Sequence, residues 1–372
     1  MLASAGTLWM GRAPHESVDK RSGVRAMQWS TRDFTNGVDS RIEARLDSLR
    51  RWNQPEVEDF IDTVTALASG GKRTRARLVR AGMLATLPDP TCPDMVAAVR
   101  LGAAVELFQL AALIHDDIID ASATRRGVPT VHAELANYHR ASGWDGSPER
   151  YGFRSGLIVG DAVLALASQE AVSAGRTAPL EPFFTMCEDV GIGQFLDIRC
   201  EYTRAATRED IHAIITHKTV SYSALFPLLI GAALAEQPAP ETIADLRAFA
   251  MPFGEAFQLR DDILGIFGDP AVTGKPAGDD LTEGKNTFLF LETLERVSEV
   301  DARWLRSLRG KRLEGDDVVR ARALMEDSGA RAHVEKMIRQ REDSARAILP
   351  RLNEAARESL GELLQRLRSR TH

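Results

Sequence analysis

The chain has 372 residues, of which 44% are hydrophobic and 27% are charged, as in an ordinary soluble globular protein. Its net charge of −6 argues against a general affinity for nucleic acid, so an anionic ligand would have to meet local basic residues or metal ions. The three cysteines show no CxxC or Cys/His spacing, which argues against a disulfide framework and a structural zinc site.

The N-terminal region is rich in Gly, Ser and Arg and shows no sustained apolar period, which predicts a mobile extension over residues 1–35. Met27 is an alternative start to Met1. No basic start is followed by an apolar run, and the most apolar stretch, 224–235, is too short to span a bilayer. The expectation is a cytoplasmic protein without stable membrane insertion.

Apolar residues recur at helical spacing from about residue 38 onward, and no segment alternates with the period of a strand. The series begins with Ile42, Leu46 and Leu49 and goes on with Val57, Ile61, Val64 and Leu67. Longer apolar helices are predicted at 93–121, 156–174, 180–203, 209–235, 241–267 and 286–297, and basic amphipathic ones at 316–347 and 351–369. Glycine and proline mark the breaks, and residues 268–284 read as a long polar loop. The pattern predicts an all-α protein in which residues 36–372 form a single domain.

The first acidic motif, Asp116-Asp117-Ile118-Ile119-Asp120, follows His115 at the end of an apolar helix. Asp116 and Asp120 are four residues apart, so they lie on one helix face about one turn apart. Carboxylate oxygens in this arrangement suit Mg²⁺. A solvated acidic helix end would look the same, and this motif alone does not decide between the two.

A second acidic motif, from Asp261-Asp262 to Gly265, stands after Gln258 at the end of another apolar helix. Two such pairs in the same setting predict facing helices that hold a diphosphate through several metal ions.

Basic residues flank these motifs. The run Gly70-Gly71-Lys72-Arg73-Thr74-Arg75 lies between two predicted helices and can offer backbone N–H groups and cations to a phosphate. Further cations stand elsewhere in the chain, namely Arg125, Arg126, Lys218 and Lys275. Each one alone is more often a surface charge, but as a set they indicate a diphosphate site.

The motifs GGKRTR, DDIID with TRRG, HKT, FQLRDD and GDPAVTGK occur in the order typical of the trans-isoprenyl diphosphate synthases, or polyprenyl synthetases, and the chain resembles that family over residues 40–370. Its loop GDPAVTGKPAGDDLTEGK is most similar to actinobacterial geranylgeranyl diphosphate synthases. The resemblance implies a homodimer of antiparallel helical bundles, each around a deep central cavity. It also implies the head-to-tail condensation of isopentenyl diphosphate with an allylic diphosphate.

The resemblance further implies a role for each matching residue. Asp116 and Asp120 would bind two of about three Mg²⁺ ions with support from Asp117, and Asp261 would bind the third with Asp262 behind it. The isopentenyl diphosphate pocket would comprise Lys72, Arg75, Gln109 and Arg126. The allylic diphosphate would be held by Arg125, Lys218, Gln258 and Lys275, with Thr219 at the reacting centre and Gln194 and Asp197 as a polar pair nearby.

Two positions depart from the family pattern. Ala76 stands where proline is common after GGKRxR, and Gly265 stands where the second acidic motif often ends in a third aspartate. We expect activity to persist, because Asp261 remains as a ligand. How the water shell of the third metal is held is left open.

No side chain is an obvious base for the proton that leaves during condensation, so the departing diphosphate is the first candidate acceptor and His115 the second. Three other functions fit less well. A class I terpene cyclase should carry a late Asn/Asp-Ser/Thr-Glu metal motif, which is missing from the sequence. A non-catalytic regulatory subunit should have damaged acidic motifs, and a helical interaction protein leaves the charges at the helix ends unexplained.

Product length can be argued from helix geometry. A growing tail that runs along the helix bearing DDIID meets Ala111 and Ala112 about one turn, or roughly 5.4 Å, upstream of Asp116. Both are small, where bulky aromatics commonly stand in family members that stop at fifteen carbons. Phe108 lies one turn deeper and is the candidate floor, unless it only packs between helices. The prediction is a twenty-carbon product, geranylgeranyl diphosphate, with a fifteen-carbon product or one of twenty-five carbons or more as the alternatives.

Overall fold

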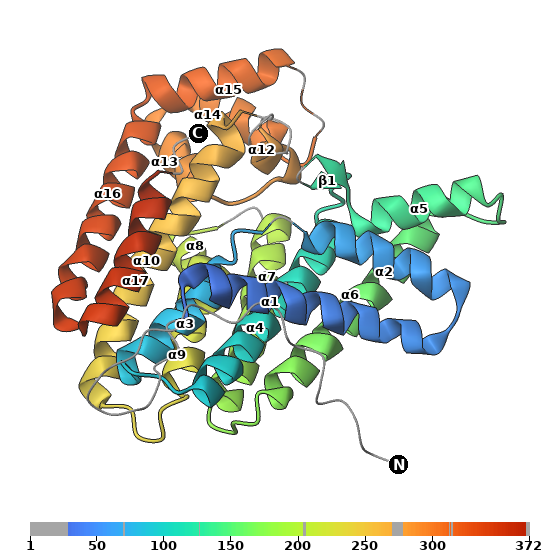
Figure 1. Cartoon of the computed structure of the whole chain (residues 1–372). Helices are drawn as coiled ribbons and strands as arrows, with labels where there is room; N and C mark the ends of the chain where they lie inside the picture. Colours follow the sequence, from blue (N-terminus) through green and yellow to red (C-terminus); the bar gives the residue numbers. More distant parts are fainter. Residues whose placement is uncertain are drawn as a thin grey trace.

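The computed structural model describes residues 29–69, 71–125, 127–203, 206–269, 278–311, 313 and 315–369. It is a bundle of helices with one small hairpin (Figure 1). The helices in chain order are α1 (Thr31–Asp47), η1 (Ser48–Trp52), α2 (Pro55–Ala68), α3 (Thr74–Thr86), α4 (Cys92–Ile119), α5 (Val131–Ala141), α6 (Pro148–Ser173), α7 (Leu180–Thr203), α8 (Arg208–Ile214), the π-helix η2 (Ile215–Leu225), α9 (Phe226–Ala232), α10 (Pro240–Phe267), α12 (Asp279–Glu283), α13 (Phe288–Arg296), α14 (Glu299–Leu308), α15 (Gly315–Asp327), α16 (Ala330–Ile348), η3 (Leu349–Arg351) and α17 (Glu354–Arg368). The all-α prediction is confirmed.

Helix α4 forms the middle of the bundle, where it packs against α1, α3 and α6. Its start is fixed by Thr91, whose backbone N–H and hydroxyl both donate to the Asp94 carboxylate, at 3.0 and 2.6 Å. Most of the residues that follow are buried, and the helix ends at Ile119 with Asp120 as its C-cap. The first acidic motif therefore stands at the end of a long, largely buried helix.

The core consists of two adjoining clusters of apolar side chains. One gathers around α1, α4 and α6, and the other joins α10 to α16 and α17, which lie side by side in Figure 1. Leu225 and Ile243 pack against both clusters. Helix α10 is thus anchored along its length, and this fixes the second acidic motif near its C-terminal end.

The hairpin is the one strand pair in the described part of the chain. It consists of β1 (Thr124–Arg125) and β2 (Val128–Pro129), which pair antiparallel with Arg125 opposite Val128. It follows α4 directly, so it turns the chain back toward the first acidic motif. Helix α5 then extends away from the bundle (Figure 1).

Several predicted boundaries need correction. The N-terminal extension does not reach residue 35, because α1 begins at Thr31 with Ser30 as its N-cap and Phe34 is fully buried. Residues 1–28 lie outside the described residues. Helix α6 begins at Pro148 rather than at 156, and the predicted helix 316–347 is two helices that separate at Gly329, whose φ is 75°.

Three helical segments are long and apolar enough, by length and composition, to cross a membrane: α4, α6 and Arg208–Ala232. The expectation that the most apolar stretch is 224–235, and that it is too short to span a bilayer, is therefore wrong. In α4, 78% of the most apolar window is buried inside the fold, so its apolar length serves the core. In α6 the corresponding share is 44%, which leaves an apolar surface.

Candidate active site

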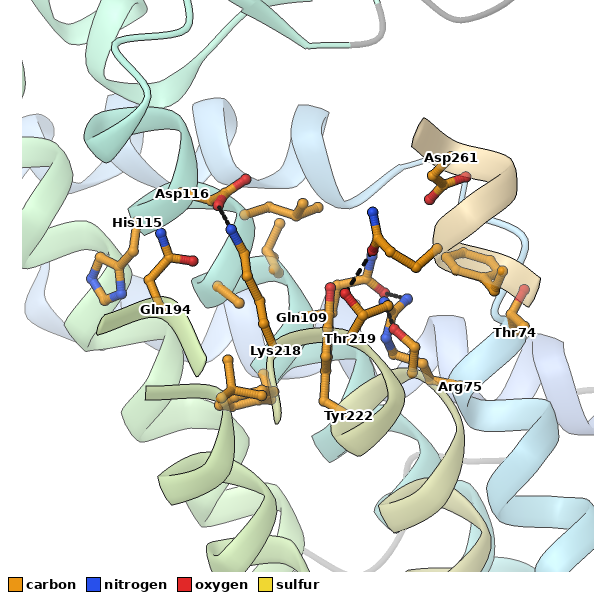
Figure 2. A pocket seen from close by; sticks show the side chains of 18 of the residues that line it. Thr74, Arg75, Gln109, His115, Asp116, Gln194, Lys218, Thr219, Tyr222 and Asp261 are labelled. Carbon is orange, nitrogen blue, oxygen red and sulfur yellow. Dashed lines mark hydrogen bonds and ion pairs between the residues drawn. The ribbon is translucent and has the colours of Figure 1, made fainter. Parts of the chain in front are cut away.

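A cavity of about 1400 Å³ opens between α3, α4, α7, η2 and α10. Figure 2 shows Asp116 of α4 and Asp261 of α10 on opposite sides of it, with Lys218 and Thr219 of η2 between them. The two acidic motifs thus face each other, as their repeated setting in the sequence predicted. Below them the cavity is lined by apolar side chains of α4 and its neighbours.

The hairpin after α4 presents Arg125 to the first acidic motif. Its Nε donates to Oδ1 of Asp117 over 2.8 Å, and its Nη2 lies 3.5 Å from Oδ2 of Asp116. Asp117 is only 1% exposed, so its carboxylate orients Arg125 rather than facing the cavity. This arrangement agrees with a supporting role for Asp117. Arg126 lies outside the described residues.

Asp120 faces a cation that the sequence reading did not single out. The Nζ of Lys285 lies 3.3 Å from Oδ2 of Asp120 and 2.5 Å from Oε2 of Glu283. Burial, and then the neighbouring Asp116, raise the pKa of Asp120 to about 6. The motif therefore concentrates negative charge that further cations would relieve.

Lys218 joins the first acidic motif to α7. Its Nζ donates to Oδ2 of Asp197 over 2.6 Å and lies 3.4 Å from Oδ1 of Asp116. Burial lowers the pKa of Lys218, but Asp116 and Asp197 outweigh it and hold that pKa above its usual value, so the ammonium stays charged. Gly193 makes this approach possible, because a Cβ there would stand 2.7 Å from Cα of Lys218.

A chain of hydrogen bonds links η2 to the second acidic motif. The Thr219 hydroxyl donates to Oε1 of Gln258 over 2.6 Å, and Nε2 of Gln258 donates to Oδ1 of Asp262 over 2.7 Å. Asp262 is 4% exposed, whereas Asp261 points toward the cavity (Figure 2). Asp262 is therefore placed behind Asp261, as the resemblance implied.

Arg75 of α3 also lines the cavity and is 7% exposed. Its guanidinium donates to Gln109 and, over 2.6 Å, to the hydroxyl of Ser223, and its Cζ lies 4.2 Å from the ring centroid of Tyr222. Lys72 is exposed at the rim of the same cavity. The structure thus brings together Lys72, Arg75 and Gln109, which the resemblance assigned to one diphosphate.

His115 is turned toward α6. Its Nε2 lies 3.3 Å from the carbonyl oxygen of Leu157 and 3.4 Å from Oδ1 of Asp161, and its ring packs where a side chain at Gly160 would stand. Gln194 of α7 lies beside it (Figure 2). These contacts favour packing and hydrogen bonding for His115 over proton transfer.

Phe108, Ala111 and Ala112 all line the cavity, as predicted for the path of a growing tail. Phe108 also packs edge-on against Tyr222, with ring centroids 6.1 Å apart. It is therefore both a packing residue and a wall of the cavity. That it stops chain growth stays a prediction.

The sequence reading missed Asp280, Lys285, Tyr222 and Glu201. It placed the cation of the 268–284 loop at Lys275, which lies outside the described residues, whereas the structure places Lys285 among the acidic side chains. Burial, and then Asp197, raise the pKa of Glu201 to about 7. In the sequence, the glycine in Glu283-Gly284-Lys285 could have indicated a turn that brings Lys285 back toward the acidic residues. In the structure Gly284 has a φ of 79°.

The carboxylates of both acidic motifs suit Mg²⁺ ions that are bound together with a substrate. Among the described residues, no three Asp, Glu, His or Cys side chains stand close enough to form a ready-made metal site. Mg²⁺ is usually bound by one or two carboxylates together with substrate phosphates, and Asp116, Asp120 and Asp261 are oxygen ligands of that kind. The donors suit metal ions that are shared with a diphosphate held between α4 and α10.

Known proteins resemble this chain over most of its length. The polyprenyl synthetase family profile matches residues 56–326. The geranylgeranyl diphosphate synthase of Mycobacterium tuberculosis is 34% identical over 298 residues, which cover 78% of this chain and 77% of that protein. The geranylfarnesyl diphosphate synthase of Aeropyrum pernix is 32% identical and matches 77% of this chain and 85% of its own.

A solved structure has the same fold. The geranylgeranyl pyrophosphate synthase from Corynebacterium glutamicum, complexed with isoprenyl diphosphate and magnesium, superposes with a TM-score of 0.85 at 33% identity. The match covers 92% of this chain and all of that one.

Proposed function

This chain belongs to the polyprenyl synthetase family, and from that premise we propose that it is a Mg²⁺-dependent prenyltransferase that joins isopentenyl diphosphate to an allylic diphosphate. The observation that supports this proposal most strongly is the pair of acidic motifs that face each other across the cavity, with the charged Lys218 between them. The family membership confirms the resemblance drawn from the motifs.

The reaction begins at the allylic C–O bond, whose electron pair leaves with the diphosphate. Lys218 and Arg125 hold the negative charge that builds on the leaving group, and Lys285 stands close enough to share this task. When bound, Mg²⁺ supplies further charge neutralisation to the same oxygens.

Carbon–carbon bond formation follows. Lys72 and Arg75 hold isopentenyl diphosphate so that its double bond attacks the allylic carbon. The adduct then loses a proton, which passes to an oxygen of the departed diphosphate, since His115 is engaged with α6. Thr219 and Gln258 are hydrogen-bonded to each other between the two substrates and orient the reacting centre.

The proposed product is geranylgeranyl diphosphate, with a fifteen-carbon or a longer chain as the alternative. Small side chains at Ala111 and Ala112 leave room beside the first acidic motif, and Phe108 with Tyr222 forms a wall deeper in the cavity. The relatives include synthases named for geranylgeranyl and for geranylfarnesyl diphosphate.

We also propose that the protein is a cytoplasmic homodimer without stable membrane insertion. Helices α6 and α7 expose an apolar face that a second copy would cover. Its members are Phe153, Leu157, Ile158, Phe184, Ile192 and Phe195, each at least 43% exposed.

To test the proposal, the purified protein is incubated with Mg²⁺, isopentenyl diphosphate and each of dimethylallyl, geranyl and farnesyl diphosphate. The masses of the products are then determined by mass spectrometry. A twenty-carbon diphosphate that forms with Mg²⁺ and fails to form in EDTA is expected. A cyclic hydrocarbon made without consumption of isopentenyl diphosphate would instead show a terpene cyclase. The absence of any elongation would contradict the proposal.

A further inference from the structure

The second acidic motif lacks a side chain at one of its positions. Gly265 follows Asp261 by one helical turn on α10, and residues four apart share a helix face. A side chain at position 265 would therefore stand beside Asp261 and face the same cavity, which both residues line.

The place of that missing side chain is filled from another element. A Cβ at position 265 would lie 2.5 Å from Cγ of Asp280 and closer still to its Oδ2. A Cβ essentially never comes within 3.0 Å of a heavy atom of a residue that is distant along the chain. The Asp280 carboxylate therefore occupies the space that a residue at 265 would use, and glycine at 265 is what admits it.

Asp280 is held in this position by its surroundings. The backbone N–H of Gly278 donates to the carbonyl oxygen of Gly265 over 3.2 Å and ties the start of α12 to α10. Leu281, the next residue after Asp280, is 2% exposed and anchors α12 in the core. The Asp280 side chain remains 14% exposed and lines the cavity together with Asp261.

The carboxylate of Asp280 also faces the cation that serves the first acidic motif. Oδ1 of Asp280 lies 4.0 Å from Nζ of Lys285, which also contacts Asp120 of the first acidic motif.

We propose that Asp280 supplies, from α12, the carboxylate that the second acidic motif lacks at position 265, and that it positions the Mg²⁺ ion bound at Asp261. This inference rests on the proposed function. Asp280 is a positioning residue in this account, since it acts through the metal and its water ligands rather than on the prenyl substrate. A purely structural Asp280 would only hold Lys285.

A charge-transplant experiment separates the two roles. The binding of inorganic diphosphate with increasing Mg²⁺ is measured by calorimetry for the wild type, Asp280→Ala, Gly265→Asp and the double variant. Asp280→Ala should raise the Mg²⁺ concentration needed for diphosphate binding at least about tenfold. Gly265→Asp alone should bind poorly and melt at a lower temperature, because two carboxylates compete for one place. In the double variant the carboxylate returns on α10, and binding should recover to within about threefold of the wild type.

Two further variants serve as controls. Asp280→Asn keeps the size of the side chain and should show the same loss as Asp280→Ala, while Asp316→Ala removes an exposed carboxylate of α15 and should match the wild type. The inference would be overturned if the Mg²⁺ dependence of diphosphate binding were unchanged in both Asp280 variants, or if the double variant bound no better than Asp280→Ala. Synthesis by the wild type would still support the proposed function in that case. A wild type that neither bound diphosphate nor elongated a prenyl chain would overturn both.

Discussion

The carboxyl group of Asp120 is buried beside Asp116, and in the metal-free protein its charged form is disfavoured. Its pKa is raised to about 6 from an ordinary value of 3.8, so folding favours the protonated form. The contribution of the Asp120 carboxyl group to the free energy of unfolding is therefore complete below pH 3.8, and it is lost as the pH rises through 6.

Asp120→Asn imitates the protonated carboxyl at every pH. In EDTA at pH 7.5 the variant should be more stable than the wild type by about 2–3 kcal/mol, and the difference should shrink toward pH 5. Urea unfolding at the two pH values measures it. A stability difference that does not depend on pH would show that Asp120 does not titrate in this way.

Lys72 and Arg75 should bind the same substrate, isopentenyl diphosphate, but their replacement should affect the stability of the protein differently. Either change to alanine should raise the KM for isopentenyl diphosphate by roughly ten- to a hundredfold and that for the allylic substrate far less. Only Arg75→Ala should also lower the melting temperature, because Arg75 is buried against Gln109, Ser223 and Tyr222 while Lys72 is exposed. A selective defect for the allylic substrate would contradict the assignment.

Single residues also show where sequence reasoning reaches its limit. At Ala76 the departure from the family's proline has a local reason, since the backbone N–H of Ala76 donates to the buried carboxylate of Glu106 over 3.0 Å. Proline has no such hydrogen to donate. The departure was visible in the sequence, but its reason lies in a contact with α4 that no local pattern reveals.

At the scale of elements, hydrophobic periodicity located the long helices well. The predictions at 93–121, 180–203 and 241–267 match α4, α7 and α10 closely, because each is a long, predominantly apolar segment. The prediction at 209–235 was one helix, whereas the chain forms α8, the π-helix η2 and α9. A periodicity of 3.6 residues cannot show a π-helix, whose wider turn changes which side chains share a face. Tyr222 was missed for that reason.

The loop before α13 was missed for a different reason. Asp280 and Lys285 meet α10 and α4 through contacts between residues far apart in the sequence. Motif spacing indicated that a polar loop was present, but only the fold shows which of its charges reach the cavity.

The position of side chains along α4 should set the length of the product. Ala111→Phe fills the cavity near Asp116 and should shorten the product from twenty to fifteen carbons, whereas Phe108→Ala removes the wall beside Tyr222 and should lengthen it. Val96→Phe places a phenyl ring on the exposed side of α4 instead and serves as the control. Mass spectrometry of the products decides, and one product from all four proteins would refute the assignment of the floor.

At the scale of the whole molecule, the apolar face of α6 and α7 should be a dimer interface. Ile158 is 66% exposed on α6, and Ile158→Glu should shift the protein from dimer to monomer in sedimentation velocity. Val319→Glu changes a side chain of α15 that is 67% exposed and should leave the dimer intact. A monomeric wild type, or an Ile158→Glu protein that still dimerises, would contradict the proposal.

The whole arrangement depends on two acidic motifs, carried by separate helices and brought face to face across one cavity. The most direct test is the Mg²⁺-dependent turnover of isopentenyl and allylic diphosphates by Asp116→Ala and Asp261→Ala, with circular dichroism to confirm that both proteins are folded. Each change should reduce turnover by roughly a hundred- to a thousandfold at saturating Mg²⁺ while the helical signal is kept. Near-normal turnover by either folded variant would contradict the account.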